Sequence, residues 1–219
     1  MSCRHIGTGW MLLLAMLMLP FSGHAMERTP DPFVEIPATA ELITSLRQGG
    51  FVLYMRHGAT DSAYPDQVPI DLNDCSTQRP LTEAGRAEIA TVGQAIRQAR
   101  IPVSEIFSSP LCRARESTQI AFGDRFTVIN ELMYTAHLTS AEKLPVIMMT
   151  RQLLSKPVAP GSNRVIVAHA PNLADLMAYF PNIEGTVVIF RPTDSGGFEY
   201  LASIHPKQWA ALLEQIEAP

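Results

Sequence analysis

Residues 50–62 read GFVLYMRHGATDS, and this stretch decides the fold. The run 51–55 is continuously apolar, which is typical of a strand buried on both faces of a parallel sheet. The run ends abruptly in Arg56, His57 and Gly58. In sheets of this kind, ligands bind beyond the carboxyl ends of the strands. The stretch therefore predicts a buried strand with a functional site at its carboxyl end.

Outward from this stretch, segments of strand and helix character alternate along the chain. Further strands are expected at 104–109, 125–129, 163–170, 185–192 and 197–204, the last two as a hairpin. Helices are expected at 39–50, 81–101, 110–123, 140–155, 171–180 and 206–216. The polar segment 59–80 is a long loop of the kind that carries function. This alternation predicts an α/β fold, three layers with a mostly parallel central sheet.

The N-terminus has the pattern of a secretory signal peptide. Arg4 precedes an apolar run over 10–19, which is followed by the small-residue ending SGHA. We expect residues 1–25 to be removed, although the run could also serve as an uncleaved anchor. Residues 26–38 are rich in proline and predict an extended lead-in to one domain, 39–219. The mature chain is therefore expected to be periplasmic or secreted.

Composition excludes several partners and sites. The 219-residue chain is acidic, with a formal net charge of −4, and has no basic run, which argues against nucleic acid. No segment after residue 25 is apolar enough for a transmembrane helix. Cys75 and Cys112 can pair in an oxidising compartment, stabilising the fold by roughly 3–5 kcal/mol, or remain separate thiols. Without a CxxC or a His/Cys cluster, a metal site is not expected.

Basic and titratable side chains recur at the ends of the expected strands. Arg56 and His57 end the first, SSPLCR presents Arg113 after the second, and AHAPN presents His169 after the fourth. Arginine guanidinium groups match phosphate oxygens, and helix N-termini add backbone N–H donors. These residues are expected to converge on one anion-binding site.

Four blocks together resemble a known family. MRHGAT, LTEAGRAEI, IFSSPLCRARESTQIAF and VIVAHAPNL have the order and spacing of the histidine phosphatase superfamily, in its phosphoglycerate mutase-like branch 1. The resemblance spans residues 51 to about 190. It implies the mutase-like fold, a phosphohistidine intermediate and no cofactor.

The resemblance also implies roles for individual residues. His57 would be the nucleophile that takes the phosphoryl group. Arg56, Arg113 and His169 would bind its non-bridging oxygens and stabilise the charge that develops during transfer. Thr60 matches a phosphate-binding hydroxyl of the family, although it could equally be a turn hydroxyl bonded to its own backbone.

The general acid has two candidates. INELMY resembles the family block after the third strand and places Glu131 at the acid position, whereas Glu184 lies on a loop that could border the site. Either carboxylate could instead be a solvated loop charge. Some members of the family lack a fixed acid and act on phosphohistidine or on good leaving groups.

The chain departs from the family pattern in ways that bear on its substrate. Residues 60–66 lack the asparagine that often follows RHG, and alanine follows His169 where phytase-like relatives have an aspartate. A phytase-like activity is therefore disfavoured. The long loop 63–79 and the signal peptide resemble an exported subgroup that includes lipopolysaccharide core heptose phosphatases.

These observations favour an exported, metal-independent phosphomonoester hydrolase. Its partner would be a small phosphorylated substrate, and the exported subgroup points to a cell-envelope glycan phosphate. Two alternatives stay open at this point. One is a non-catalytic module that binds phosphorylated glycans or proteins, and the other is a phosphatase of phosphohistidine in proteins.

Overall fold

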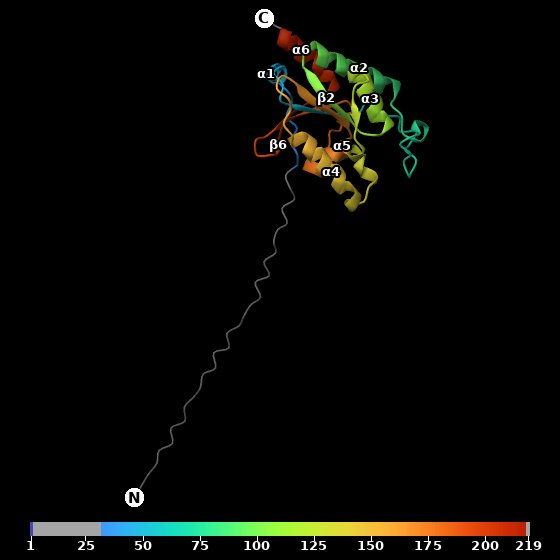
Figure 1. Ribbon diagram of the computed structural model, residues 1–219, viewed down its shortest axis with the longest axis vertical. Coiled ribbons are helices and arrows are strands. Elements are labelled where there is room, and N and C mark those ends of the chain that lie inside the picture. The colour runs from blue at the N-terminus through green and yellow to red at the C-terminus, as the bar shows by residue number, and fades with distance from the viewer. Residues whose placement is uncertain (2–31, 218–219) are drawn as a thin grey trace. The chain divides into compact units, whose positions relative to one another are not determined.

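A mixed six-stranded sheet forms the centre of the part that the structure, a computed structural model, describes, which is residues 32–217 and Met1 (Figure 1). The strand order is β3-β2-β4-β1-β5-β6. The bounds are β1 (Val52–Arg56), β2 (Val103–Ser108), β3 (Thr127–Val128), β4 (Asn163–Ala168), β5 (Val187–Pro192) and β6 (Phe198–Ile204). The expected signal peptide, 1–25, lies outside the described residues except for Met1.

The sheet is mostly parallel, as predicted. Of the six described strands, β5 alone runs in the opposite direction to the others. β1 pairs in parallel with β4, β4 with β2, and β2 with β3. β5 is antiparallel to β1 and forms the expected hairpin with β6. β1 therefore lies inside the sheet, paired on both sides, which explains its continuous apolar sequence.

Helices cover both faces of the sheet and give the predicted three layers (Figure 1). Side chains of β1 alternate between the two resulting cores. Leu53 and Met55 pack with the helices of one layer, and Val52 and Tyr54 with those of the other. The first layer holds α1 (Ala40–Leu46), α2 (Glu83–Gln98), α3 (Cys112–Phe122) and α6 (Trp209–Glu217), and the second α4 (Ser140–Ser155) and α5 (Ala170–Met177).

Local sequence signals set most of the helix ends. The Thr82 side chain accepts a hydrogen bond from the Gly85 N–H and caps α2, as predicted. Thr139 and Glu142 form a capping box at the start of α4. The prediction for α3 was wrong by two residues, because the helix begins at Cys112 and Pro110 lies before it. Short 3₁₀ helices also form at Cys75–Thr77, Asn130–Leu132, Thr135–His137 and Pro206–Gln208.

The described part of the lead-in, 32–38, contains no helix and runs beside β6. Ser203 donates its N–H to the Ile36 carbonyl at 2.8 Å, and the Phe33 ring stacks on Tyr179 with centroids 4.2 Å apart. The domain boundary proposed at residue 39 stays a prediction. Among the described helices, none is long and apolar enough to cross a membrane.

Candidate active site

Two parallel strands deliver the two histidines to one edge of the sheet. Arg56 is in register with Ala168, so the residues that follow them, His57 and His169, are neighbours. The His57 N–H donates to the Ala168 carbonyl at 3.1 Å, and the two imidazole rings lie 5.1 Å apart. The parallel pairing of β1 with β4 thus brings together residues more than a hundred positions apart in sequence.

His57 is held as a neutral imidazole. Its ring is buried, and its Nδ1 lies 2.8 Å from the Gly58 carbonyl oxygen, which can only accept. Nδ1 therefore carries the proton, and Nε2 keeps its lone pair. Burial, followed by the nearby Arg113 charge, lowers the pKa of His57 to about 3. Neutral His57 is thus available as a nucleophile at any physiological pH.

His169 is held in a complementary way. Its Nε2 lies 2.7 Å from the Ser109 Oγ, which itself accepts the Leu111 N–H. The buried Ser109 hydroxyl forms no other hydrogen bond as a donor with the described residues, so we infer that it donates its proton to Nε2, which leaves the ring proton on Nδ1. That Nδ1 is buried and has no hydrogen-bond partner among the described residues. Burial, then the neighbouring His57 and Arg113, holds the pKa of His169 well below its usual value.

Arg56 is fixed by the loop that precedes β5. Its Nη1 donates to the carbonyls of Pro181 and Asn182, both at 2.7 Å, and its Nη2 to a Glu184 carboxylate oxygen at 2.6 Å. The Nε–H is buried and has no acceptor in the described part of the chain. Three of the five N–H donors of Arg56 therefore orient the guanidinium, and the Nε–H and one Nη2 hydrogen are left for a ligand.

Arg113, the second residue of α3, is fully buried. Its Nη1 donates to Asp66 at 2.9 Å, and its guanidinium lies 5.3 Å from the centre of the Tyr134 ring. Its Nε and Nη2 have no acceptor among the described residues. Burial lowers the pKa of Arg113 from its ordinary value, but a guanidinium stays protonated. The site thus contains a buried cation with spare donors.

The RHG turn is pressed against two helices. The Gly58 N–H donates to the Ser117 Oγ of α3 at 3.0 Å, and Thr82, before α2, donates its N–H to the Ala59 carbonyl at 2.9 Å. A Cβ on Gly85 of α2 would overlap the backbone of Ala59. These contacts fix the position of the RHG turn relative to the sheet.

The remaining sequence candidates are placed differently. Thr60 forms an isolated bridge with Leu81, and its hydroxyl has no hydrogen bond within the described residues. Glu184 touches the site through Arg56. Glu131 lies on the 3₁₀ helix that follows β3 and is exposed, with no ion pair in the described chain. The structure therefore brings Arg56, His57, Arg113 and His169 together and leaves the acid position open at the surface.

Several residues of the site had not been predicted. They are Asp66, which binds Arg113; Arg79, whose Nε is buried and unpaired; Ser109, which orients His169; and Tyr134, whose ring lies 5.4 Å from His169. Ser109 lies inside the recognised block IFSSPLCRARESTQIAF, so its place at a strand end was a usable signal. The others lie in loops that have no regular pattern.

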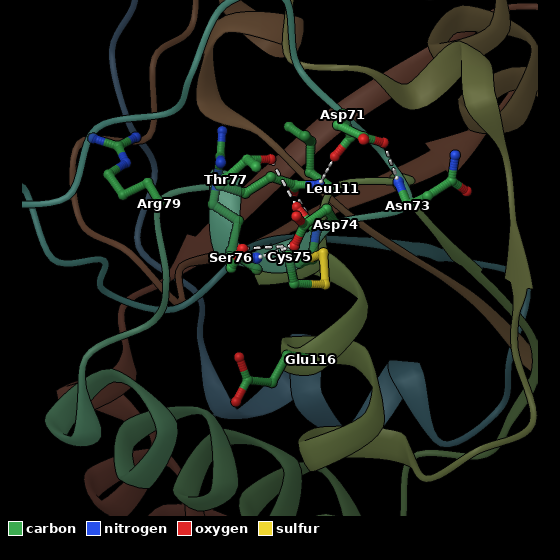
Figure 2. Close-up of a disulfide and its surroundings, with 12 residues drawn as sticks. Asp71, Asn73, Asp74, Cys75, Ser76, Thr77, Arg79, Leu111 and Glu116 are labelled. Carbon is green, nitrogen blue, oxygen red and sulfur yellow. Dashed lines mark hydrogen bonds between the residues drawn. A yellow bond between two sulfur atoms is a disulfide. The ribbon is translucent and has the colours of Figure 1, made fainter.

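A disulfide ties the long loop to the helix that carries Arg113 (Figure 2). Cys75, in the 3₁₀ helix of the loop, bonds to Cys112, the first residue of α3, with Cα atoms 5.7 Å apart. Gln78 accepts the Cys112 N–H at 2.8 Å and donates to the Asp71 carbonyl at 2.7 Å. Of the two alternatives left open by the sequence, the structure therefore has the disulfide and not two separate thiols.

A small cavity of about 220 Å³ lies on the far side of Tyr134 and Asp66, which both contact the site. It lies between the long loop and the segment after β3, and it is lined by Ser62, Pro65, Asp66, Val68, Arg79, Tyr134 and His137. Tyr134 links the cavity to Arg113 and His169. Within the described residues, no group of three His, Cys, Asp or Glu side chains is placed to hold a metal ion.

Together these side chains form a donor-rich pocket around an unprotonated nitrogen. The buried nitrogens without an acceptor in the described chain include Nε of Arg56, Arg79 and Arg113, Nη2 of Arg113 and Nδ1 of His169. Buried polar groups are almost always hydrogen-bonded in native proteins. A cluster of unpaired cationic donors therefore indicates a site for a tetrahedral oxyanion.

Comparison with known proteins agrees with this chemistry. Residues 52–132, which include Arg56, His57 and Arg113, match the protein-family model "Histidine phosphatase superfamily (branch 1)". No curated protein matches the chain in sequence.

Two solved structures share the fold. One is the protein histidine phosphatase SixA complexed with tungstate, at 19% identity and a TM-score of 0.51, covering 72% of this chain and 98% of SixA. The other is the alpha-ribazole phosphatase from Shigella flexneri, at 15% identity and a TM-score of 0.51, covering 69% of this chain and 95% of that one.

Proposed function

Because this chain belongs to the histidine phosphatase superfamily, branch 1, and is a phosphatase, we propose that it hydrolyses small phosphomonoesters through a phosphohistidine on His57. One observation carries the proposal: His57 keeps an unprotonated Nε2 within range of the charges of Arg113 and Arg56, whose buried guanidinium nitrogens include donors with no acceptor among the described residues. Neither a nucleophile nor an anion site alone would support transfer, but the two together do.

The first half-reaction follows from the hydrogen bonds around His57. Its Nε2 lone pair attacks phosphorus, and the bond from phosphorus to the ester oxygen breaks. The imidazole becomes cationic, and the Gly58 carbonyl that accepts from Nδ1 stabilises this charge. Arg56, Arg113 and His169 donate to the non-bridging oxygens, where charge is concentrated during transfer. The leaving oxygen takes a proton from a carboxylic acid or from water.

The second half-reaction returns the enzyme to its starting state. A water molecule attacks phosphorus and gives its proton to the carboxylate, or the hydroxide, left by the first half-reaction. The bond from phosphorus to Nε2 breaks, its electron pair returns to Nε2, and inorganic phosphate leaves. The donors that bound the substrate phosphoryl group bind the product in the same way. Every charge is met by the protein's own side chains, so the proposed reaction is metal-independent.

The acid in this scheme is proposed to be Glu131. Its position after β3 matches the family block, and its exposure leaves it free to meet a leaving group at the mouth of the site. Glu184 is assigned a positioning role, because its carboxylate is already bound to Arg56. Thr60 keeps its proposed role as a phosphate-binding hydroxyl.

The substrate is proposed to be a phosphorylated glycan of the cell envelope, met after export. The support is in the sequence: a signal peptide expected over 1–25 and a loop over 63–79 similar to that of the exported subgroup. Phosphohistidine of a protein is the second candidate. It is favoured by the absence of any carboxylate hydrogen-bonded to His57 or His169 among the described residues, since a good leaving group needs little acid.

Hydrolysis of p-nitrophenyl phosphate in the presence of EDTA tests the proposal. Wild type is expected to turn over and His57→Ala to lose all turnover, while Lys156→Ala, at an exposed lysine before β4 and so at the opposite edge of the sheet, retains it. Tungstate, which is bound by SixA, is expected to inhibit competitively. An acid-labile phosphoryl group on wild type, missing from His57→Ala, identifies the intermediate.

Two results would contradict the proposal. Turnover that depends on a metal removed by EDTA would exclude the metal-independent reaction. A wild-type protein that binds tungstate but hydrolyses no phosphomonoester would be a binding module instead.

A further inference from the structure

We propose that Arg79 is a third substrate-binding arginine, which donates hydrogen bonds to the phosphoryl group from the leaving-group side. This inference rests on the proposed phosphatase function and adds a residue to it. Arg79 lies in the long loop between β1 and α2, outside the strand ends that predicted the other residues.

A single carboxylate oxygen places Arg79 next to Arg113. Asp66 Oδ1 accepts the Arg79 backbone N–H at 2.8 Å and the Arg113 Nη1 at 2.9 Å. The Asp66 side chain is only 4% exposed, so both bonds lie inside the protein. Asp66 therefore holds the Arg79 backbone next to the Arg113 guanidinium. In the proposed mechanism, this guanidinium binds the phosphoryl group.

The guanidinium of Arg79 has no acceptor of its own. Its Nε is buried without a hydrogen-bond partner, and its two Nη atoms form no hydrogen bond with the described residues. Asp66, which lines the same cavity, forms its ion pair with Arg113, and Arg79 has no ion pair among the described residues. A partly buried cation without a counterion is unfavourable unless a ligand supplies the missing charge. An oxyanion bound between Arg79 and Arg113 would do so.

The cavity lined by Tyr134 gives the direction of this contact. Arg79 and Tyr134 line it together, and Tyr134 also lies over Arg113 and against His169. Arg79 therefore lies where the cavity meets the phosphoryl site. With a volume of about 220 Å³, the cavity has room for the first group attached to the ester oxygen. A guanidinium at this boundary reaches the phosphoryl group from the side of the leaving group.

The loop that carries Arg79 is anchored at neighbouring positions. Gln78, the preceding residue, accepts the Cys112 N–H, and the disulfide from Cys75 holds the same end of α3. Figure 2 shows the Arg79 side chain pointing away from this disulfide. Anchoring of this kind restricts the backbone and so reduces the entropy lost when the guanidinium binds a ligand.

The positive charge of Arg79 acts on the two histidines of the site. After burial and nearer charges, Arg79 is a further cause of the lowered pKa of His57 and of His169. Its effect on each histidine is smaller than those of burial, Arg113 and Arg56.

Three variants of the full chain test the assignment: Arg79→Gln, Arg79→Lys and the control Arg115→Gln. Arg115 is an exposed arginine of α3. We expect Arg79→Gln to weaken tungstate inhibition and to lower kcat/KM for p-nitrophenyl phosphate by roughly 10- to 100-fold, the range for a hydrogen bond to a charged group. Arg79→Lys is expected to recover part of this loss, and Arg115→Gln to match wild type.

An NMR titration of His57 shows whether Arg79 acts on the site through its charge or has only a structural role in the loop. The pKa of His57 is expected to rise in Arg79→Gln and to stay low in Arg79→Lys, which keeps the charge. Tungstate inhibition within twofold of wild type in Arg79→Gln would overturn the inference. That result, alongside a His57→Ala variant without turnover, would leave the proposed phosphatase function intact. A wild type without turnover would instead count against the function itself.

Discussion

Two buried histidines in one site have opposite tasks because their hydrogen bonds fix opposite tautomers. His57 donates from Nδ1 to a carbonyl and keeps Nε2 free to attack, whereas His169 accepts a hydroxyl proton at Nε2 and keeps Nδ1 as a donor. Both rings remain neutral because burial and neighbouring arginines disfavour a further positive charge. The chemical difference between them therefore lies in Gly58 and Ser109, and not in the imidazoles.

The choice of leaving group separates the role of Glu131 as general acid from the positioning role of Glu184. We expect Glu131→Gln to lower kcat for an alkyl phosphate by about 100-fold, the scale of general acid catalysis, with a smaller effect on p-nitrophenyl phosphate. Glu184→Gln, acting through Arg56, is expected to raise KM for both esters alike. Steady-state kinetics of the two variants on the two substrates give the comparison.

The opposite pattern would reassign the acid. If Glu184→Gln lost only the alkyl ester and Glu131→Gln lost neither, Glu184 would be the proton donor. If neither variant distinguished the esters, the enzyme would lack a fixed acid, which would favour phosphohistidine as the substrate.

At the scale of elements, the site is made where a strand end meets helix α2. The absence of a side chain at Gly85 lets α2 approach the Ala59 backbone, directly after the RHG turn. Gly93, two turns further along the same helix, allows an equally close approach to Ala121 of α3, where an added Cβ would lie 2.6 Å from the Ala121 Cα. One helix thus makes two similar contacts, one beside the site and one away from it.

This pair of glycines gives a matched test of how strictly the turn must be placed. Gly85→Ala and Gly93→Ala are each expected to lower the free energy of unfolding by about 1–3 kcal/mol through overpacking. Gly85→Ala should also lower kcat/KM, by about 100-fold if His57 moves by about 1 Å. Urea unfolding and steady-state kinetics provide the measurements, and equal activity in both variants would contradict the account.

At the scale of the whole molecule, burial of neutral histidines makes stability depend on pH. The folded-state pKa of His57 is about 3, and that of His169 is also far below the ordinary 6.5. Below pH 6.5 the unfolded chain therefore binds protons that the folded chain does not, so stability falls as the pH falls. The disulfide adds a contribution independent of this titration, about 4 kcal/mol by the chain-entropy estimate for its loop.

We expect the free energy of unfolding to fall by about 2 kcal/mol per buried histidine between pH 7.5 and pH 5. Urea denaturation at a series of pH values measures this slope. His57→Ala should remove about half of the decrease, and His137→Ala, at an exposed histidine, should leave it unchanged. A slope that is the same in all three proteins would show that His57 is not buried in its neutral form.

Much of the fold could be predicted from the sequence because the signals are local. Continuous apolarity marked β1 and β4 as buried strands, and Thr82 marked the start of α2. The ends of three strands also supplied Arg56, His57, Arg113 and His169, which the structure gathers at one edge of the sheet. The start of α3 was misplaced because Pro110 is acceptable both before a helix and within its first turn.

Tertiary structure alone decided how those groups act. Arg79, Asp66 and Tyr134 lie in irregular loops, and their relation to Arg113 or His169 exists only after the chain has folded. The same is true of the proton positions on the two histidines, which depend on the carbonyl or hydroxyl that folding places beside each ring. Local patterns encode residue type and backbone shape, whereas pKa values and hydrogen bonds depend on distances and burial among segments far apart in sequence.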